Sequence, residues 1–199
     1  MPSDANTNRI SGLEALLKAQ SGKGPAPVER WSPPYCGDIG LRIRADGTWL
    51  YRDSPIGRAA LVKLFAGVLR KDADGRHYLV TPVEKIDVSV DDAPFLAVEM
   101  EVRGSGPEQS LIFRTNVDHI VTAGPEHPLR FAVEASSDGL KPYLNVRGRL
   151  EALATRALAY DLAQLAVEEA GRGLGLWSGG TFFPLPGDPS SQAPSESGS

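Results

Sequence analysis

The sequence is poor in cysteine and contains no long apolar segment, and both absences limit what the protein can be. Cys36 is the one cysteine among 199 residues, so an internal disulfide is excluded and a disulfide-rich secreted scaffold is not indicated. No run of about 18 apolar residues occurs, and the N-terminal MPSDANTNR lacks the apolar core of a signal peptide. We therefore expect a cytoplasmic protein with no membrane partner.

An excess of charge of one sign is also missing. The formal net charge is −4, with 23% charged and 41% hydrophobic residues. This composition is globular and gives no general attraction to nucleic acid, so we expect no nucleic-acid partner. A chain of 199 residues is long enough for one ordinary domain or two small ones.

Catalytic and metal-binding patterns are absent from the sequence as well. Cys36 would need a histidine beside it to act as a nucleophile, but His77, His119 and His127 are scattered along the chain. They also lack the close spacing of zinc ligands, so we expect no metal and no cofactor, and we interpret Cys36 as a packing residue. Without paired carboxylates or a nucleophile–base pair, enzymatic activity is the least favoured of three function classes.

The clearest structural pattern runs from Asp38 to Leu69. Apolar residues alternate with polar ones up to Ile43, which is typical of a strand with one buried face. Asp46-Gly47 then predicts a tight turn into a second strand at 48–51. Ser54-Pro55 predicts the start of a helix whose apolar stripe is Leu61, Leu64, Phe65, Val68 and Leu69.

A weaker copy of this pattern begins 92 residues later. The alignment places Asp46-Gly47 on Asp138-Gly139, Tyr51 on Tyr143, and Ala60-Leu61 on Ala152-Leu153. We interpret it as a duplication of one strand–hairpin–helix unit, since a solenoid would need more repeats at shorter spacing.

The remaining segments complete a two-part prediction. Residues 1–27 form an N-terminal helix and linker, 28–82 a first α+β part, 83–186 a second part, and 187–199 a tail whose composition predicts disorder. Alternation in the second part predicts a curved antiparallel sheet or barrel, and the leucines of 149–170 predict a long helix that closes it. The predicted fold class is α+β.

An ordered string of short motifs resembles the bacterial family known as domain of unknown function 1285. The resemblance covers roughly residues 28–183 and implies a two-part α+β structure with a repeated motif, a second part similar to pleckstrin-homology barrels, and a ligand cleft between the parts that suits a nucleotide. It implies no established activity. The motifs are Trp31–Pro33, Cys36–Asp38, Asp46–Tyr51, Ser54–Ile56, Leu61–Phe65, Leu79–Lys85, Asp91–Phe95, Thr115-Asn116, His127–Arg130 and Pro142–Leu144.

Five residues form the candidate ligand site. Trp31, Tyr35 and Asp38 lie on a proline-stiffened loop, while Arg58 and Lys63 lie on the predicted helix. An aromatic wall, a carboxylate and a cation could together hold a base and its phosphate. Taken singly, each residue is better explained by packing or by a solvated surface.

Two function classes remain open. The first is a ligand-binding or sensing protein, active in a process such as signal transduction, that holds a small anionic, nucleotide-like molecule between the two parts. The alternative is a protein-interaction module that offers a sheet edge or groove to a protein partner of unknown identity.

Overall fold

The computed structural model describes residues 12–15, 17–18, 26–135, 137 and 139–187. Of the tail predicted at 187–199 only Gly187 is described, and of the N-terminal helix predicted within 1–27, residues 12–15 and 17–18 are described and helical. The chain divides into two units, which we call the first and the second unit. The first consists of Met1–Leu96, Thr115–His119 and Val146–Ala152, and the second of Ala97–Arg114, Ile120–Asn145 and Leu153–Ser199.

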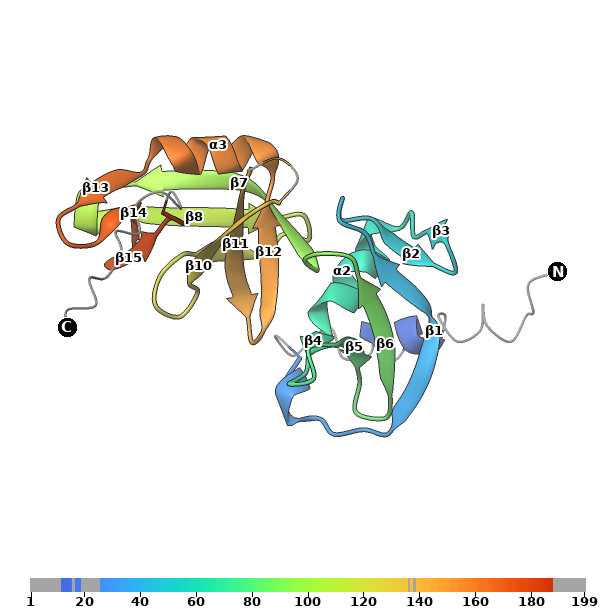
Figure 1. Cartoon of the computed structure of the whole chain (residues 1–199). Helices are drawn as coiled ribbons and strands as arrows, with labels where there is room; N and C mark the ends of the chain where they lie inside the picture. The colour runs from blue at the N-terminus through green and yellow to red at the C-terminus, as the bar shows by residue number, and fades with distance from the viewer. Residues whose placement is uncertain (1–11, 16, 19–25, 136, 138, 188–199) are drawn as a thin grey trace, which may run out of the picture. The chain divides into compact units, whose positions relative to one another are not determined.

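A six-stranded sheet is the main element of the first unit (Figure 1). Its order is β3-β2-β1-β6-β5-β4, in which β1 and β6 are parallel and the other pairs are antiparallel. The turn predicted at Asp46-Gly47 is confirmed, because Gly47 has a φ of 82° between the antiparallel β1 and β2. The strands are β1 (Tyr35–Ile43), β2 (Trp49–Tyr51), β3 (Ser54–Pro55), β4 (Leu69–Lys71), β5 (His77–Val80) and β6 (Lys85–Val90); a short 3-10 helix, η1, spans Val28–Arg30.

Helix α2 (Ala59–Gly67) contributes its apolar stripe to the core of the first unit. Phe65 is completely buried, with its ring centroid 6.2 Å from that of the buried Trp49. The predicted helix start at Ser54-Pro55 is wrong, because both residues form β3 and the helix begins at Ala59. A proline without an N–H group suits an edge strand as well as a helix start, so the local signal was ambiguous.

Strand β6 extends the first sheet beyond the boundary that we predicted at Pro82. It pairs with both β1 and β5. Pro82 lies instead in a tight turn, where the Thr81 hydroxyl accepts hydrogen bonds from the N–H groups of Val83 and Glu84.

A second six-stranded sheet has the order β10-β11-β12-β7-β8-β9 and curls into a half-barrel. It is mixed, so the prediction of a wholly antiparallel sheet was wrong, and the chain is mostly β with few helices. The strands are β7 (Phe95–Arg103), β8 (Ser110–Thr115), β9 (Ile120–Thr122), β10 (Leu129–Val133), β11 (Leu140–Arg147) and β12 (Leu150–Ala154), and a 3-10 helix, η2, spans Gly106–Glu108.

The long helix predicted at 149–170 is also wrong. Its first residues form β12, helix α3 spans only Arg156–Gln164, and β13 (Val167–Glu169) follows directly. In β12 the side chains of Leu150, Ala152 and Ala154 are buried and their neighbours are half-buried, which is strand alternation. A small antiparallel sheet of β13, β14 (Gly173–Ser178) and β15 (Thr181–Pro184) ends the described chain.

The two six-stranded sheets share one strand order. Read from β9 to β10, the second sheet repeats the sequence of the first, with β7 in the place of β1 and β12 in the place of β6. Strand β7 starts 60 residues after β1 (Tyr35 to Phe95), and β10 starts 60 residues after β4 (Leu69 to Leu129). The alignment at 92 residues is therefore wrong, because it places Ala60-Leu61 of α2 on Ala152-Leu153 of β12.

Candidate functional site

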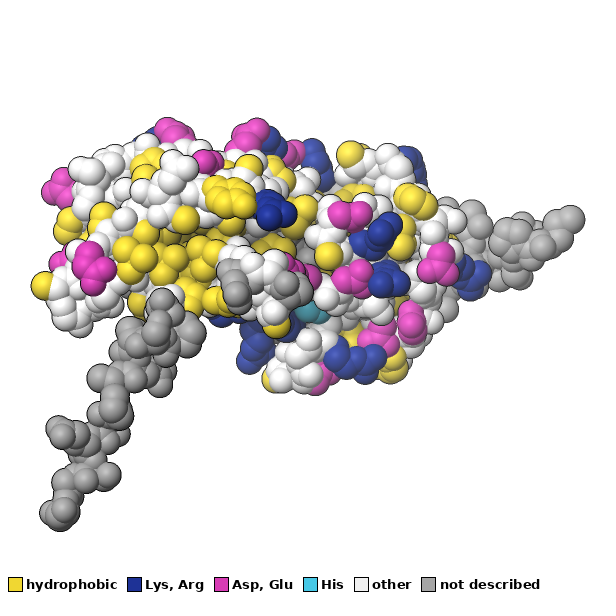
Figure 2. Space-filling model, turned by 45° about the horizontal axis from the view of Figure 1, so that its top comes forward, with side chains coloured by type: hydrophobic (Ala, Val, Ile, Leu, Met, Phe, Trp, Pro, Cys, Tyr) yellow, Lys and Arg dark blue, Asp and Glu magenta, His cyan; other side chains and the backbone are white. Residues whose placement is uncertain are grey.

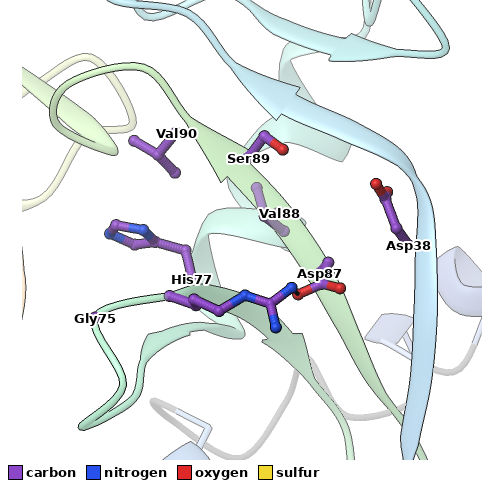
Figure 3. A pocket seen from close by; sticks show the side chains of 8 residues that line it. Asp38, Gly75, His77, Asp87, Val88, Ser89 and Val90 are labelled. Atoms are coloured by element: carbon purple, nitrogen blue, oxygen red, sulfur yellow. Dashed lines mark hydrogen bonds and ion pairs between the residues drawn. The ribbon is translucent and has the colours of Figure 1, made fainter.

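Tyr35 and Asp38 on β1 belong to a polar cluster with Asp87 on β6 and Arg76 just before β5. Figure 3 shows Asp38 and Asp87 on their neighbouring strands. The Tyr35 hydroxyl donates a hydrogen bond to the Asp87 carboxylate, whose other oxygen accepts one from Arg76 Nη2 at 2.7 Å. Asp87 is buried to all but 7%. The bond to Asp87 raises the pKa of the Tyr35 hydroxyl, because the neutral phenol is the form that donates.

A cavity of about 340 Å³ opens at this cluster, lined by Asp38, Gly75, Arg76, His77 and Asp87 to Val90. Strand β1 bulges here, since its register against β6 shifts between Asp38 and Leu41. The cavity has two carboxylates in its lining, and its one arginine is paired with Asp87. This electrostatic environment opposes an anionic ligand.

Arg58 is the N-cap residue of α2, and its side chain turns to a carboxylate. Its guanidinium forms a bidentate pair with Glu14, with Nη1–Oε1 and Nη2–Oε2 distances of 3.1 and 2.5 Å. Lys18 and Arg58 together lower the pKa of Glu14. The charge of Arg58 is therefore compensated within the protein.

Lys63 lines a second cavity of the first unit, of about 230 Å³, at the start of α2. The cavity wall comes from the β1–β2 turn, from the residues before and in the first turns of α2, and from Asn116. Lys63 forms an ion pair with Asp118, and both side chains are about half exposed. The lining residues are Gly47, Thr48, Trp49, Ile56, Gly57, Ala59, Val62, Lys63 and Asn116.

The start of α2 carries backbone donors that the helix itself does not use. The first N–H groups of a helix have no intrahelical acceptor, and no side chain caps them here. Asn116 is fixed beside this region, because its Oδ1 accepts from the N–H of Leu96 at 3.0 Å and its own N–H donates to the Leu96 carbonyl at 2.9 Å. Ammonium, amide and backbone donors therefore meet at one small cavity.

Trp31 lies next to a structural arginine. Arg70 Nη1 donates to the carbonyl oxygens of Val28 and Trp31 at 2.7 and 2.8 Å. The Trp31 side chain is half-buried. Arg70 is itself buried and bonded to Asp72, so it holds the loop before β1 in place.

The five predicted residues are thus divided between three places of the first unit: Tyr35 and Asp38 at the cluster around Asp87, Arg58 and Lys63 at α2, and Trp31 beside Arg70. Asp38 and Lys63 line different cavities, and Arg58 adjoins the second one as the N-cap of α2. Asn116, Thr48 and Gly57, which line the second cavity, were not among the site residues selected from the sequence. Of these residues, only Gly57 could have been found from the sequence, because it lies just before a helix.

The titratable groups give no sign of a metal centre in the described part of the chain. Among those residues no three His, Cys, Asp or Glu side chains are grouped as metal ligands would be. Burial lowers the pKa of His77 to about 4, with a further contribution from Lys71, and burial also lowers that of His119. No helix within the described ranges is both long and apolar enough to span a bilayer.

Comparison with known proteins places the chain in a family. Residues 26–93 match the domain of unknown function (DUF1285), N-terminal domain, and residues 94–185 match the protein of unknown function (DUF1285), C-terminal domain. No curated protein matches the chain.

Two solved structures are similar to it. A DUF1285 family protein from Silicibacter pomeroyi DSS-3 is 48% identical, with a TM-score of 0.77 over 85% of this chain and 93% of that one. A second, from Shewanella baltica OS155, is 28% identical, with a TM-score of 0.50 over 63% of this chain and 91% of the other. The chain therefore belongs to the DUF1285 family.

Proposed function

We propose that the first unit binds a small anionic molecule at the start of α2, without catalysis. The observation that carries this proposal is the composition of the 230 Å³ cavity, whose lining includes Lys63 but no acidic residue among the residues described there. Unused N–H groups and the positive end of the helix dipole favour an anion at the same place. The cavity at Asp38 and Asp87 lacks this advantage.

The ion pair between Lys63 and Asp118 sets the strength of binding. An incoming anion shares or replaces Asp118 as the partner of Lys63. Half-exposed pairs of this kind contribute little stability, so the exchange costs little. Asp118 acts as an internal competitor for the anion.

The size of the cavity limits the ligand. Its volume of about 230 Å³ is below that of most drug-sized sites. A phosphate group or small phosphate ester fits, and a nucleotide would place its phosphate inside and its base outside. This agrees with the nucleotide-like ligand that the sequence led us to expect.

Differential scanning fluorimetry with inorganic phosphate and a panel of mononucleotides tests the proposal. Ligand that binds only the native state raises the unfolding temperature, and the shift grows with the logarithm of the ligand concentration above Kd. We expect Lys63→Gln to reduce the shift, because it removes the ammonium group, and Asp118→Asn to increase it, because it removes the competing carboxylate. Asparagine is a suitable replacement, since it accepts the left-handed conformation of residue 118, which has a φ of 63°. Lys71→Gln, which removes a charge on β4, serves as the control and should leave the shift unchanged.

Opposite responses of the two variants are the signature of competition at one site. If no anion shifts the transition at millimolar concentration, or if Lys63→Gln and Asp118→Asn behave alike, the proposal fails.

A second candidate function is protein interaction through the edges of the second sheet. Strands β9 and β10 are its edge strands and carry exposed apolar residues, Ile120 at 65% and Val133 at 50% exposure. Exposed edges can accept a strand from a partner. A stoichiometric partner recovered from native lysate by the wild type and lost with Ile120→Lys or Val133→Lys would favour this function over the first.

A further inference from the structure

A groove of about 560 Å³ opens in the second unit, in addition to the two cavities of the first unit. It is formed by α3, the start of β11, the end of β12 and the turn between β10 and β11. Its size is that of a small-molecule binding site. The lining residues are Glu134, Ser137, Gly139, Leu140, Lys141, Leu153, Ala154, Arg156, Ala159, Tyr160 and Ala163.

Most of the groove wall is apolar. Leu140 and Leu153 are half-buried, and Tyr160 on α3 is 59% exposed although its ring is a large apolar surface. The small side chains of Ala159 and Ala163 leave the space open. Figure 2 shows hydrophobic side chains gathered over the surface of the second unit, whereas charged and apolar side chains alternate over the first.

The polar part of the wall is mainly cationic. Lys141 and Arg156 line the groove together with one described carboxylate, Glu134, which accepts a hydrogen bond from the Ser137 hydroxyl at 2.6 Å. A hydrogen bond to Tyr160 raises the pKa of Arg156, and the charge of Glu134 makes a smaller contribution in the same direction. Two cations against one described carboxylate in the lining favour a negatively charged head group.

We propose that this groove binds an amphipathic monoanion, namely an unbranched medium-chain carboxylate. Its hydrocarbon body contacts Leu140, Leu153 and Tyr160, and its carboxylate pairs with Arg156 and Lys141. Guanidinium and carboxylate groups match in geometry, so the head group fixes the orientation while the apolar wall supplies most of the affinity. The site is independent of the anion site at α2, and either can fail without the other.

Isothermal titration calorimetry on the full chain tests the proposal with three ligands of equal chain length, below their micellar concentrations. Decanoate carries the expected negative head group, decan-1-ol a neutral one and decyltrimethylammonium a positive one. We expect decanoate to bind about fivefold tighter than decan-1-ol, the value of one partly exposed charge pair, and the ammonium compound to bind weakest.

Two variants and a control locate the site. Arg156→Gln should lower the affinity for decanoate about fivefold and leave that for decan-1-ol unchanged. Ala163→Trp should abolish binding of both, because residue 163 is exposed and a large side chain there fills the groove without disturbing the core. Arg103→Gln removes an exposed arginine of the second unit outside the groove and should change nothing.

Several results would overturn this assignment. Equal affinity for the three head groups would remove the anionic preference, and binding that survives Ala163→Trp would place the ligand elsewhere. If decanoate does not bind and sedimentation shows self-association that Ala163→Trp abolishes, a second copy of the chain occupies the groove instead.

Discussion

The same arginine–tyrosine pair occurs at equivalent positions of the two six-stranded sheets, in different surroundings. Arg70 on β4 lies opposite Tyr78 on β5, and Arg130 on β10 lies opposite Tyr143 on β11. Each arginine follows a leucine, 60 residues apart along the chain (Leu69 and Leu129). The repeated strand order therefore extends to individual side chains.

Burial separates the two pairs. Arg70 is 9% exposed and bonds to Asp72 and to two loop carbonyls. Arg130 is exposed and lies over the Tyr143 ring, with 4.0 Å from Cζ to the ring centroid. In the first sheet this arginine has a structural role, whereas its counterpart in the second sheet, Arg130, lies at the surface. The same strand order is thus compatible with two different electrostatic environments for the arginine.

The largest effect should come from replacing Arg70, the buried one of the two arginines. Arg70→Ala leaves two carbonyls without their donor and removes one of the two cationic partners of Asp72, the other being Lys85. We expect a loss of about 2–4 kcal/mol in the free energy of unfolding. Arg130→Ala removes one surface cation–π contact and should cost about 0.5–1 kcal/mol. Urea denaturation of both variants measures the difference.

Arg44→Ala is the matched control, because this exposed arginine of the first unit is 3.9 Å from its carboxylate partner. Its cost should be near zero. Equal costs for Arg70→Ala and Arg130→Ala would show that burial does not distinguish the two pairs.

A smaller difference in stability is expected between substitutions at Gly47 and Gly139, which the 92-residue alignment placed at equivalent positions. Gly47 has a left-handed φ of 82°, and a Cβ there would lie 2.9 Å from Asn116 Nδ2. A Cβ on Gly139 would lie 3.0 Å from the Oγ of Ser137, an exposed side chain that can move aside. We expect Gly47→Ala to cost about 1–3 kcal/mol and Gly139→Ala to stay within about 0.5 kcal/mol. Thermal unfolding measures both costs. Similar costs for the two substitutions would support the 92-residue alignment, which the strand positions contradict.

The smallest effect is a pH dependence that belongs to the first sheet. His77 precedes Tyr78, whereas Pro142 precedes Tyr143 in the second sheet. The pKa of His77 falls from its usual 6.5 to about 4 on folding, so the unfolded state binds more protons between these values. Stability is then complete above pH 6.5 and declines as the pH falls toward 4.

Because the imidazole keeps some solvent contact, we expect a decline of about 1 kcal/mol over that range. Denaturation of His77→Gln at pH 6.5 and pH 4.5 should show a flatter profile than the wild type. A profile that keeps the wild-type slope would assign the pH dependence to other groups.

The first two strands of the first unit were predictable, and the reason is visible in the side chains. Ile39, Leu41 and Ile43 are all buried, so alternation and an Asp-Gly turn were sufficient. Leu69, which was predicted on the helix stripe, instead begins β4. Leu150 and Leu153 misled the analysis, because residues three apart match a helix stripe while Leu150, Ala152 and Ala154 match a strand. In so short a segment, pairing with neighbouring strands decides between the two.

The candidate site was predictable only in part. Arg58 and Lys63 were correctly placed on or beside a helix start, but the sequence does not reveal that Glu14 and Asp118 neutralise them. These partners lie 44 and 55 residues away along the chain. The contribution of Asn116 likewise depends on tertiary structure, since its side chain reaches the cavity through a hydrogen bond to Leu96.

Backbone amide NMR during titration with inorganic phosphate tests the central claim, anion binding at the start of α2, most directly. The account predicts saturable shifts of the Gly57 and Ala59 amides, weakened by Lys63→Gln and strengthened by Asp118→Asn. Amides at the α2 start that do not move while phosphate shifts resonances elsewhere would contradict it.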